Sequence, residues 1–335
     1  MSKILEDSPQ RWSVMVPCYQ PSLLLRETLA SARAALRGLS SEVQLEIVDD
    51  ASPDVDVRDL VNSWNIPDVR VYRRETNGGL AKCWNTCIHR AQGEFIHILH
   101  QDDLVKPNFY CKLQDLFVRH PLAGMAFCRS EFLQESTISE EPIEQHDEGI
   151  LLDWIDRICE RQRLQCPSVV VRKSTYEKVG GFDEKLKYVV DWEMWVRIAA
   201  HFPVAYTPKV LASYRCHADS ETARLKHSGL ISKDSKQAYN RIKKSLRGSE
   251  YQLQRQLVFE YLLFISSGAV SMAAASGDFG LARRELQSLI RCWGASMPLR
   301  QLMKHSKWYL NLTFQLPGWG KWIRFSTRYS TKKPG

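Results

Sequence analysis

The N-terminal part of the sequence alternates between short apolar runs and longer amphipathic ones. The apolar runs have the length of strands and cover residues 12–16, 43–48, 69–72 and 94–99. The runs between them have helical periodicity and cover residues 22–36, 55–64 and 80–91. A chain that passes repeatedly from strand to helix to strand forms right-handed crossovers between parallel strands. We therefore expect an α/β fold with a mostly parallel sheet flanked by helices.

Polar segments follow three of the predicted strands directly. They are PCYQ at residues 17–20, DDAS at 49–52 and HQDD at 100–103. In an open α/β sheet, ligands bind beyond the carboxyl ends of the strands. We expect the three segments to meet on one rim of the sheet and to form a ligand site there.

The pattern continues less regularly to about residue 220. It predicts helices at 107–120, 150–163 and 191–200, strands at 125–128, 168–172 and 209–215, and a turn at 180–182. The polar stretch 130–148 has little periodicity and is interpreted as a mobile loop. Helical patterns dominate beyond residue 220, at 228–245, 251–275 and 279–292. We therefore divide the chain into a domain of residues 1–220 and an all-α region of residues 221–335.

Charge and composition limit the class of protein. The formal net charge of +8 suits contact with phosphates, nucleic acid or an acidic membrane surface and does not choose among them. The nine cysteines are odd in number and scattered, which favours reduced thiols over a disulfide framework. The first residues lack the pattern of a secretory signal peptide, so we expect a cytoplasmic protein. Polar residues interrupt the apolar stretch 257–275, and we expect no membrane span there.

Aromatic and basic residues interleave in the last segment, residues 300–335, where Trp308, Trp319 and Trp322 stand among lysines and arginines. This composition suits a peripheral contact at the inner face of the cell membrane, because the rings lie at the headgroups and the cations meet anionic lipid. The alternative is a helix that packs on the protein and exposes a basic face.

The pair Asp49–Asp50 ends an apolar strand. A carboxylate there can accept hydrogen bonds from a nucleobase or from ribose hydroxyls, and Tyr19 can lie against the face of the base. An Asx turn or a helix cap is the alternative interpretation.

The segment NGGLAKCWN, which begins at Asn77, places two glycines before a helix. Gly79 permits close approach of the backbone, and the helix N-terminus together with Lys82 favours a diphosphate. A plain turn followed by a helix explains the same residues, and the segment lacks a Walker-type lysine pattern.

The strongest local signal is the pair Asp102–Asp103. Neighbouring carboxylates repel each other unless a cation or solvent offsets their charge. Mn²⁺ or Mg²⁺ bound to few carboxylates and to phosphate oxygens would fit this pair at the end of a strand. A solvated turn with a helix cap before Pro107 is the alternative.

The segments SVMVPCYQP, EIVDDAS, NGGLAKCWN, HQDDLVKP, GGFDE, VDWEMWVRI and YRCHADS stand in this order along residues 11–220. In order and spacing, the series resembles the signatures of glycosyltransferase family 2, the inverting enzymes of the GT-A fold. The resemblance implies a Rossmann-like mixed sheet flanked by helices. It also implies a metal-dependent glycosyltransferase of the hexosyltransferase type.

Position by position, the resemblance implies a nucleotide-sugar site. Pro17, Tyr19 and Asp50 would contact the base, and Gln20 and Asp49 beside them are assigned to the same donor site. Asp103, together with Asp102, would bind the metal on the diphosphate, and Asp191 would be the general base. His217 would approach the metal or the diphosphate, although a structural histidine is the alternative. The implied site residues are Pro17, Tyr19, Gln20, Asp49, Asp50, Asn77, Gly79, Lys82, Asp102, Asp103, Asp191 and His217.

Two positions depart from the family pattern. Trp84 stands where many relatives have an arginine that contacts phosphate, and Val190 stands where many have an acid before the aspartate. Asp191 also fits without the resemblance, because an inverting transfer needs one carboxylate to take the proton of the acceptor hydroxyl. A helix cap is the alternative role for Asp191, and Glu193 is a second candidate for the base that should face elsewhere on the helix.

We therefore expect an enzyme that moves a sugar from a nucleoside diphosphate, with UDP favoured because many relatives use it, to a hydroxyl of a glycan or lipid-linked acceptor. Synthesis of surface polysaccharide is the setting that the resemblance implies. A non-catalytic nucleotide-sugar-binding or scaffold protein of the same fold is the alternative. The absence of a G-x-G-x-x-G motif after the first strand argues against a dinucleotide oxidoreductase. We expect no nucleic-acid partner, because the sequence shows no aromatic RNA-binding motif.

Overall fold

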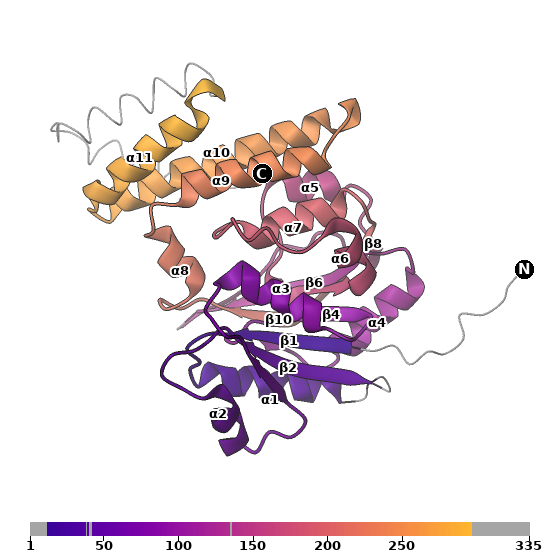
Figure 1. Ribbon diagram of the computed structural model, residues 1–335. Helices are drawn as coiled ribbons and strands as arrows, with labels where there is room; N and C mark the ends of the chain where they lie inside the picture. Colours follow the sequence, from indigo (N-terminus) through magenta and orange to yellow (C-terminus); the bar gives the residue numbers. More distant parts are fainter. Residues whose placement is uncertain (1–11, 38, 40–41, 135, 297–335) are drawn as a thin grey trace, which may run out of the picture. The chain divides into compact units, whose positions relative to one another are not determined.

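The computed structural model describes residues 12–37, 39, 42–134 and 136–296 (Figure 1). The aromatic and basic segment 300–335 lies outside the described residues. The chain divides into two compact units. The sheet unit comprises the chain up to Ile158, Gln162–Glu184 and Val190–His217, and the helical unit comprises Cys159–Arg161, Lys185–Val189 and the chain from Ala218 on.

The first elements alternate between strand and helix, as the sequence predicts. They are β1 (Trp12–Cys18), α1 (Leu24–Leu36), β2 (Val43–Asp49), α2 (Val57–Ser63), β3 (Arg70–Arg73), α3 (Leu80–Arg90) and β4 (Phe95–Ile98). Strands β3, β2, β1 and β4 lie side by side in that order, and all of them run parallel (Figure 1). The alternation therefore gives the crossovers that were expected.

The later elements make the sheet mixed rather than mostly parallel. They are β5 (Leu104–Val105), α4 (Phe109–Arg119), β6 (Met125–Leu133), β7 (Ile138–Glu140), β8 (Gly149–Ile150), α5 (Trp154–Glu160), the 3₁₀ turn Cys166–Ser168, β9 (Val169–Arg172), α6 (Lys173–Val179), α7 (Val190–Ala199) and β10 (Val204–Arg215). The order across the sheet is β3-β2-β1-β4-β9-β6-β10-β5. Strand β9 lies between β4 and β6 and runs antiparallel to both, whereas β10 is parallel to β6. The structure thus confirms the expected mixed sheet flanked by helices.

The stretch 130–148 is not the single mobile loop that was expected. Strand β6 continues to Leu133, and β7 returns beside it as an antiparallel partner. Glu141 then closes the hairpin, because its N–H donates to Ser130 O at 2.9 Å and its carboxylate accepts from Ser130 N at 2.8 Å. The exposed residues of β7 are mostly polar, so the sequence pattern did not indicate that this segment pairs with β6.

Large aromatic side chains fill the core beneath the parallel strands. The buried ring of Trp12 lies 5.1 Å from the ring of Phe95 and 5.2 Å from that of Tyr110, measured between centroids. Phe95 also stacks on Phe117. The indole N–H of Trp12 donates to Gln114 Oε1 at 2.8 Å, so the core keeps no unpaired donor at this ring.

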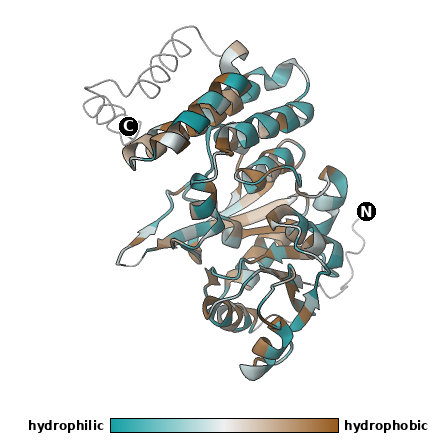
Figure 2. Ribbon diagram, turned by 60° about the vertical axis from the view of Figure 1, so that its left-hand side comes forward, coloured by the Kyte–Doolittle hydropathy of each residue, from teal (hydrophilic) through white to brown (hydrophobic). Residues whose placement is uncertain are grey.

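The helical unit consists of helices in its described residues from Ala218 to Ser296, which confirms the all-α expectation there. The helices are α8 (Glu221–Lys226), α9 (Ile231–Ser245), α10 (Gln252–Ala275) and α11 (Phe279–Trp293), with 3₁₀ turns at Ser249–Tyr251 and Gly294–Ser296. Teal and brown both occur along the helices in Figure 2, and α9 and α11 carry their buried residues on one face. The rings of Tyr239, Phe259 and Trp293 meet where α9, α10 and α11 pack together. The sequence analysis missed α8, as it missed α6 in the sheet unit.

We expected polar residues to exclude a membrane span at residues 257–275, but α10 with the turn before it has the length and composition of one. The segment Ser249–Ala275 is long and apolar enough to cross a membrane by length and composition, although 44 % of its most apolar window is buried. A core helix passes the same test. Because α10 packs against both α9 and α11, its apolar composition is explained by burial inside the helical unit.

The hairpin carboxylate Glu141 generates a prediction about stability. Burial raises the pKa of Glu141 to about 7, against hydrogen bonds from Ser130 that lower it. The folded state therefore holds this proton to higher pH than the unfolded state, and the stability that Glu141 contributes is lost as pH rises from about 4.5 through 7. This loss lowers the free energy of unfolding of the unmodified protein by up to roughly 2–3 kcal/mol, and we expect it to be absent in Glu141→Gln.

Urea denaturation of both proteins across this pH range measures the effect. Glu140→Gln is the matched control, because Glu140 is exposed on the same hairpin and pairs with Arg129. An unchanged pH dependence in Glu141→Gln would contradict the assignment of the buried proton.

Candidate active site

The sheet register brings the three polar segments together. Strand β1 pairs in parallel with β2 on one side and with β4 on the other, so their carboxyl ends lie at one rim. Gln101 ties two of the segments, because its side chain accepts from Tyr19 N and donates to Tyr19 O, both at 3.1 Å. Gln20 N donates to Ser52 Oγ at 2.9 Å and ties the third. The predicted meeting of these segments is therefore present.

Asp49 is buried and engaged within the protein. Its carboxylate accepts from Ser52 N at 3.0 Å and Ser52 Oγ at 2.6 Å, and it pairs with Arg73 at 2.6 Å. These partners hold the turn after β2 in shape. The structure thus gives Asp49 an organising role in the loop, and its contact with a nucleotide stays a prediction.

Asp50 connects the second segment to the glycine loop. It accepts from Gly78 N at 3.0 Å and Gly79 N at 2.8 Å, and it forms an ion pair with Arg74. A Cβ on Gly78 would lie 2.5 Å from Arg74 Nη1, so a side chain there would displace the guanidinium that pairs with Asp50. The sequence analysis missed Arg74, although an arginine directly after a strand of the sheet was a usable signal.

The other predicted donor residues surround this loop. Pro17 lies near the end of β1 and is buried, whereas Asn77 and Lys82 are exposed. Gly79, with φ of 80°, occupies the cap position before α3, so this helix begins at the loop as predicted. Exposed groups at this helix start are free to meet an anion in solvent.

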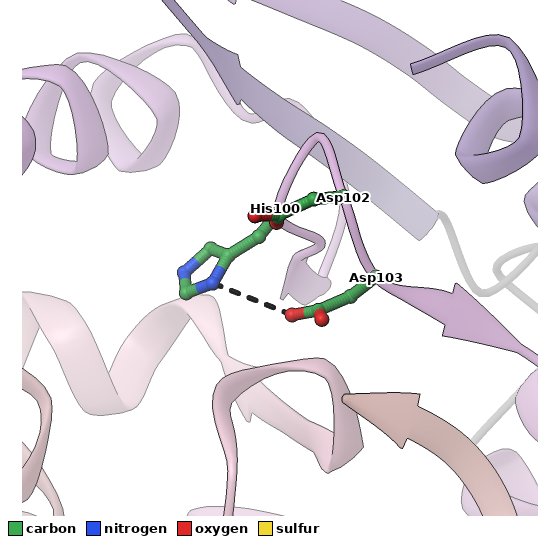
Figure 3. A group of neighbouring side chains, drawn as sticks. All are labelled: His100, Asp102 and Asp103. Atoms are coloured by element: carbon green, nitrogen blue, oxygen red, sulfur yellow. Dashed lines mark ion pairs between the residues drawn. The ribbon is translucent and has the colours of Figure 1, made fainter. Parts of the chain in front are cut away.

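The acidic loop gathers three potential metal ligands from one turn of chain. Figure 3 shows His100, Asp102 and Asp103 on this loop, with one ligand atom of each within 4.8 Å of the others. Asp103 Oδ1 accepts from Arg215 N at 2.9 Å, at the end of β10. Asp103 Oδ2 is buried, accepts no hydrogen bond and lies 3.5 Å from His100 Nδ1. A buried carboxylate oxygen without a donor beside two further ligands fits a divalent cation.

His217 joins the acidic loop through Asp102 rather than through Asp103. Its Nε2 lies 2.9 Å from Asp102 Oδ2, and it follows β10 by two residues. His217 is therefore in a position to orient the Asp102 carboxylate, and its predicted role at the metal stays a prediction.

Trp84 has no charge to offer a phosphate at the position where relatives have arginine. Its buried ring stacks on His100, with centroids 5.0 Å apart and planes 20° apart, and meets Phe182 edge-on at 4.8 Å. Trp84 therefore fixes the imidazole of the acidic loop. This packing is the structural consequence of the departure from the family pattern.

Electrostatics in the loop favour a cation. Burial raises the pKa of Asp103 to about 6, although the nearby His100 lowers it. Burial lowers the pKa of His100, but Cys166 and Asp103 together raise it well above its usual value. A bound cation would favour the ionised carboxylate, which this environment otherwise penalises.

Asp191 lies in the first turn of α7, inside the helix rather than at its cap position. Its Oδ2 accepts from Gln162 Nε2 at 2.9 Å, and its Oδ1 accepts from Trp192 N at 2.7 Å. Burial raises the pKa of Asp191 despite these donors. Cys166 interacts electrostatically with both Asp191 and Asp103, and Asp191 interacts with His100, so the candidate base lies within electrostatic range of the acidic loop. A carboxylate with a raised pKa suits proton abstraction.

Glu193 is unsuited to be the base. It forms a buried, two-fold ion pair with Arg197, with N–O distances of 2.9 and 2.8 Å. The same guanidinium donates to Val179 O, Gly180 O and Gly181 O. Glu193 is therefore engaged by Arg197, and the pair anchors α7 to the turn before it.

The GGFDE segment meets the glycine-loop helix. Asn85 on α3 donates to Phe182 O at 3.0 Å and accepts from Phe182 N at 2.7 Å. A Cβ on Gly181 would lie 2.4 Å from Asn85 Oδ1, which explains the glycine at that position. The sequence analysis did not anticipate this contact, because the two residues are far apart in the chain.

Comparison with known proteins agrees with this arrangement. The family described as Glycosyl transferase family 2 matches residues 13–166, which include all three rim segments and the glycine loop. Residues 13–166 thus match glycosyl transferase family 2, and the resemblance inferred from the motifs is confirmed over this part of the chain.

Named relatives share part of their length with this chain. An uncharacterised glycosyltransferase of Rickettsia typhi is 25 % identical over 221 residues, which are 63 % of this chain and 65 % of the relative. The minor teichoic acid biosynthesis protein GgaB of Bacillus subtilis is 24 % identical over 179 residues, which are 52 % of this chain and 19 % of that protein. This chain thus matches just under two thirds of the first relative and a small part of the second.

Solved structures share the fold. TarS residues 1–349 of S. aureus, determined in complex with UDP-GlcNAc, superposes with a TM-score of 0.64 at 17 % identity and covers 83 % of this chain and 81 % of that one. The mannosyltransferase PcManGT of Pyrobaculum calidifontis, determined with GDP-Man and Mn²⁺, gives a TM-score of 0.55 at 16 % identity over 93 % and 88 % of the two chains. At these identities the likeness concerns the fold alone.

Proposed function

We propose that the protein is an inverting, metal-dependent glycosyltransferase of the hexosyltransferase type that transfers a sugar from a nucleoside diphosphate to a hydroxyl acceptor. One observation carries the proposal. Asp191, a carboxylate with a raised pKa, interacts electrostatically with His100 of the acidic loop, whose Asp103 keeps a buried oxygen without a hydrogen-bond donor. A base close to a loop that could hold a cation on the leaving diphosphate is what direct displacement at a sugar carbon requires.

In the proposed reaction, Asp191 accepts the proton of the acceptor hydroxyl while the hydroxyl oxygen bonds to the anomeric carbon. The bond from this carbon to the diphosphate oxygen breaks, and its electron pair leaves with the diphosphate. The hydrogen bonds from Gln162 and Trp192 N hold the Asp191 carboxylate in orientation. The attack comes from the face opposite the leaving group, so the anomeric configuration inverts.

Asp103 and Asp102 would hold Mn²⁺ or Mg²⁺, with His100 and His217 beside them. When bound, the cation would offset the negative charge that develops on the leaving diphosphate. The residues fit this role because Asp103 Oδ2 has no donor of its own. Asp50, Gly79 and Lys82 would organise the nucleotide side of the donor site.

UDP-sugar is the proposed donor class, and a glycan or lipid-linked hydroxyl is the proposed acceptor. The UDP-GlcNAc complex of TarS supports a uridine donor, while the GDP-Man complex of PcManGT defines the competing one. The relation to GgaB, a teichoic acid biosynthesis protein, supports a role in cell-surface polysaccharide synthesis. A panel of UDP-, GDP- and dTDP-sugars assayed for release of the nucleoside diphosphate would identify the donor.

The metal role of Asp103 is tested by binding. We expect UDP to bind the unmodified protein at least roughly tenfold more tightly with Mn²⁺ than without it, because a cation held by Asp102 and Asp103 would offset the negative charge of the diphosphate. Asp103→Ala should remove this difference, and isothermal titration calorimetry measures it. Asp115→Ala, which removes an exposed acid from α4, is the control and should keep the difference. Equal affinity with and without Mn²⁺ in the unmodified protein would refute the metal role.

The base is tested by turnover. We expect Asp191→Asn to lower kcat by at least about 10²-fold, because the amide cannot take the proton, while UDP affinity stays within about twofold. Asp153→Asn, at a solvent-exposed acid before α5, is the matched control and should keep normal turnover. Near-normal kcat in Asp191→Asn would exclude Asp191 as the base. If the unmodified protein binds UDP with Mn²⁺ but turns over no sugar nucleotide, the scaffold alternative holds instead.

We propose a cytoplasmic location with peripheral membrane contact through residues 300–335. No acidic residue follows Glu285 in the sequence, whereas lysines and arginines recur to the end. We expect the full chain to sediment with vesicles that contain anionic phosphatidylglycerol, and less so in high salt, because the attraction is electrostatic. A chain truncated after Leu299 should remain in the supernatant. Equal sedimentation of the two chains would contradict the membrane role.

A further inference from the structure

A buried aspartate of the helical unit holds the backbone that leads into α7. Asp234 lies in the first turn of α9 and is 3 % exposed. Its carboxylate accepts from Lys187 N at 2.7 Å, Tyr188 N at 2.8 Å and Val189 N at 3.1 Å. Three hydrogen bonds from consecutive amides to one carboxylate fix the orientation of those peptide planes.

The held tripeptide is covalently close to the candidate base. Val189 precedes Val190, where α7 begins, and Asp191 is the next residue. A helix turns by about 100° per residue, so a change in the backbone before its first turn rotates the side chains of that turn. The opposite end of the same turn is fixed, since Glu193 forms the buried ion pair with Arg197. The direction of Asp191 therefore depends on how the chain enters the helix.

We propose that Asp234 is a positioning residue for the base, because it holds residues 187–189, the segment that continues directly into α7. Asp234 would act through the backbone of residues 187–189 and would touch neither donor nor acceptor. This inference rests on the proposed function, because it assigns Asp234 a role relative to Asp191 as the base. It also gives the C-terminal helices a role that their sequence does not indicate.

The helical unit contains a matched control. Glu285 on α11 is also buried, and its carboxylate accepts from Ile231 N at 3.3 Å and from Ser232 Oγ at 3.2 Å. It thus stabilises the start of the same helix, α9, through backbone and hydroxyl donors outside residues 187–189. Glu285→Gln removes a buried carboxylate from the helical unit just as Asp234→Asn does. If Asp234 only stabilised the helical unit, the two substitutions would have similar effects on turnover.

The test uses the full chain and the sugar nucleotide that the unmodified protein turns over fastest. We expect Asp234→Asn to lower kcat roughly 10- to 100-fold, because a small displacement of a catalytic group costs this much. KM for the donor and the affinity for UDP with Mn²⁺ should stay within about twofold, since donor-binding residues are not displaced. Glu285→Gln should keep kcat within about twofold. Hydrogen exchange at the amides of residues 187–189 should be faster in Asp234→Asn and unchanged in Glu285→Gln.

Asp234→Glu is the second variant, which keeps the charge if Asp234→Asn does not fold. Its longer side chain should give a kcat below that of the unmodified protein, with UDP affinity retained. Full kcat in either Asp234 variant, or an equal loss in Glu285→Gln, would overturn the positioning role. An unmodified protein that turns over no sugar nucleotide would contradict the proposed function and this inference together. An active unmodified protein with a fully active Asp234→Asn variant would contradict the inference alone.

Discussion

The backbone pairing of β1 with both β2 and β4 is the constraint on which the site depends. β1 aligns with β2 from Trp12 to Cys18 and with β4 from Trp12 to Met15. Because these strands are parallel and in register, the segments that follow them leave the sheet at one rim. Side chains then tie the segments to each other, with Gln101 bonded to the backbone of Tyr19 as one such link. The hydrogen-bonded sheet, with its apolar interior, therefore positions the polar residues of the rim.

Carboxylates on this rim divide into two groups by their partners. Asp49 and Asp50 form ion pairs with Arg73 and Arg74 and hold the turn after β2 and the glycine loop. Asp103 meets the backbone N–H of Arg215 and the imidazole of His100 but, among the ion pairs of the described residues, no arginine side chain, and its Oδ2 is buried without a hydrogen-bond donor. An uncompensated buried carboxylate is costly unless a cation or a proton relieves it. Asp49 and Asp50 are thus engaged by arginine side chains within the protein, whereas Asp103 is suited to bind a metal.

The sequence predicts the part of the fold in which strands and helices alternate regularly. The alternating runs indicated β1 to β4 and the helices between them, and the motif order indicated the family. The regular alternation that indicated parallel strands ends after β4, so the insertion of β9 antiparallel to its neighbours was not foreseen. The β6–β7 hairpin was missed because its polar residues hide a pairing that Glu141 completes.

The candidate site was predictable where a residue lies at the end of a strand, as for Asp103. It was not predictable where a role comes from a distant contact. Gln162 bonded to Asp191, Arg197 anchored to the turn at Gly180, and the packing of Trp84 on His100 all join residues that no local pattern relates. For Asp49, position alone was not enough. Its place at a strand end indicated a contact with a ligand, but in the structure it is buried and bonded to Ser52 and Arg73.

The central claim is that Asp103 and its neighbours hold a cation on the donor diphosphate. Crystals of the full chain grown with UDP and Mn²⁺, measured at the manganese absorption edge, test this claim most directly. We predict an anomalous peak within coordination distance of an Asp103 carboxylate oxygen and of a diphosphate oxygen. UDP bound at the rim with no manganese at Asp102 or Asp103 would contradict the account.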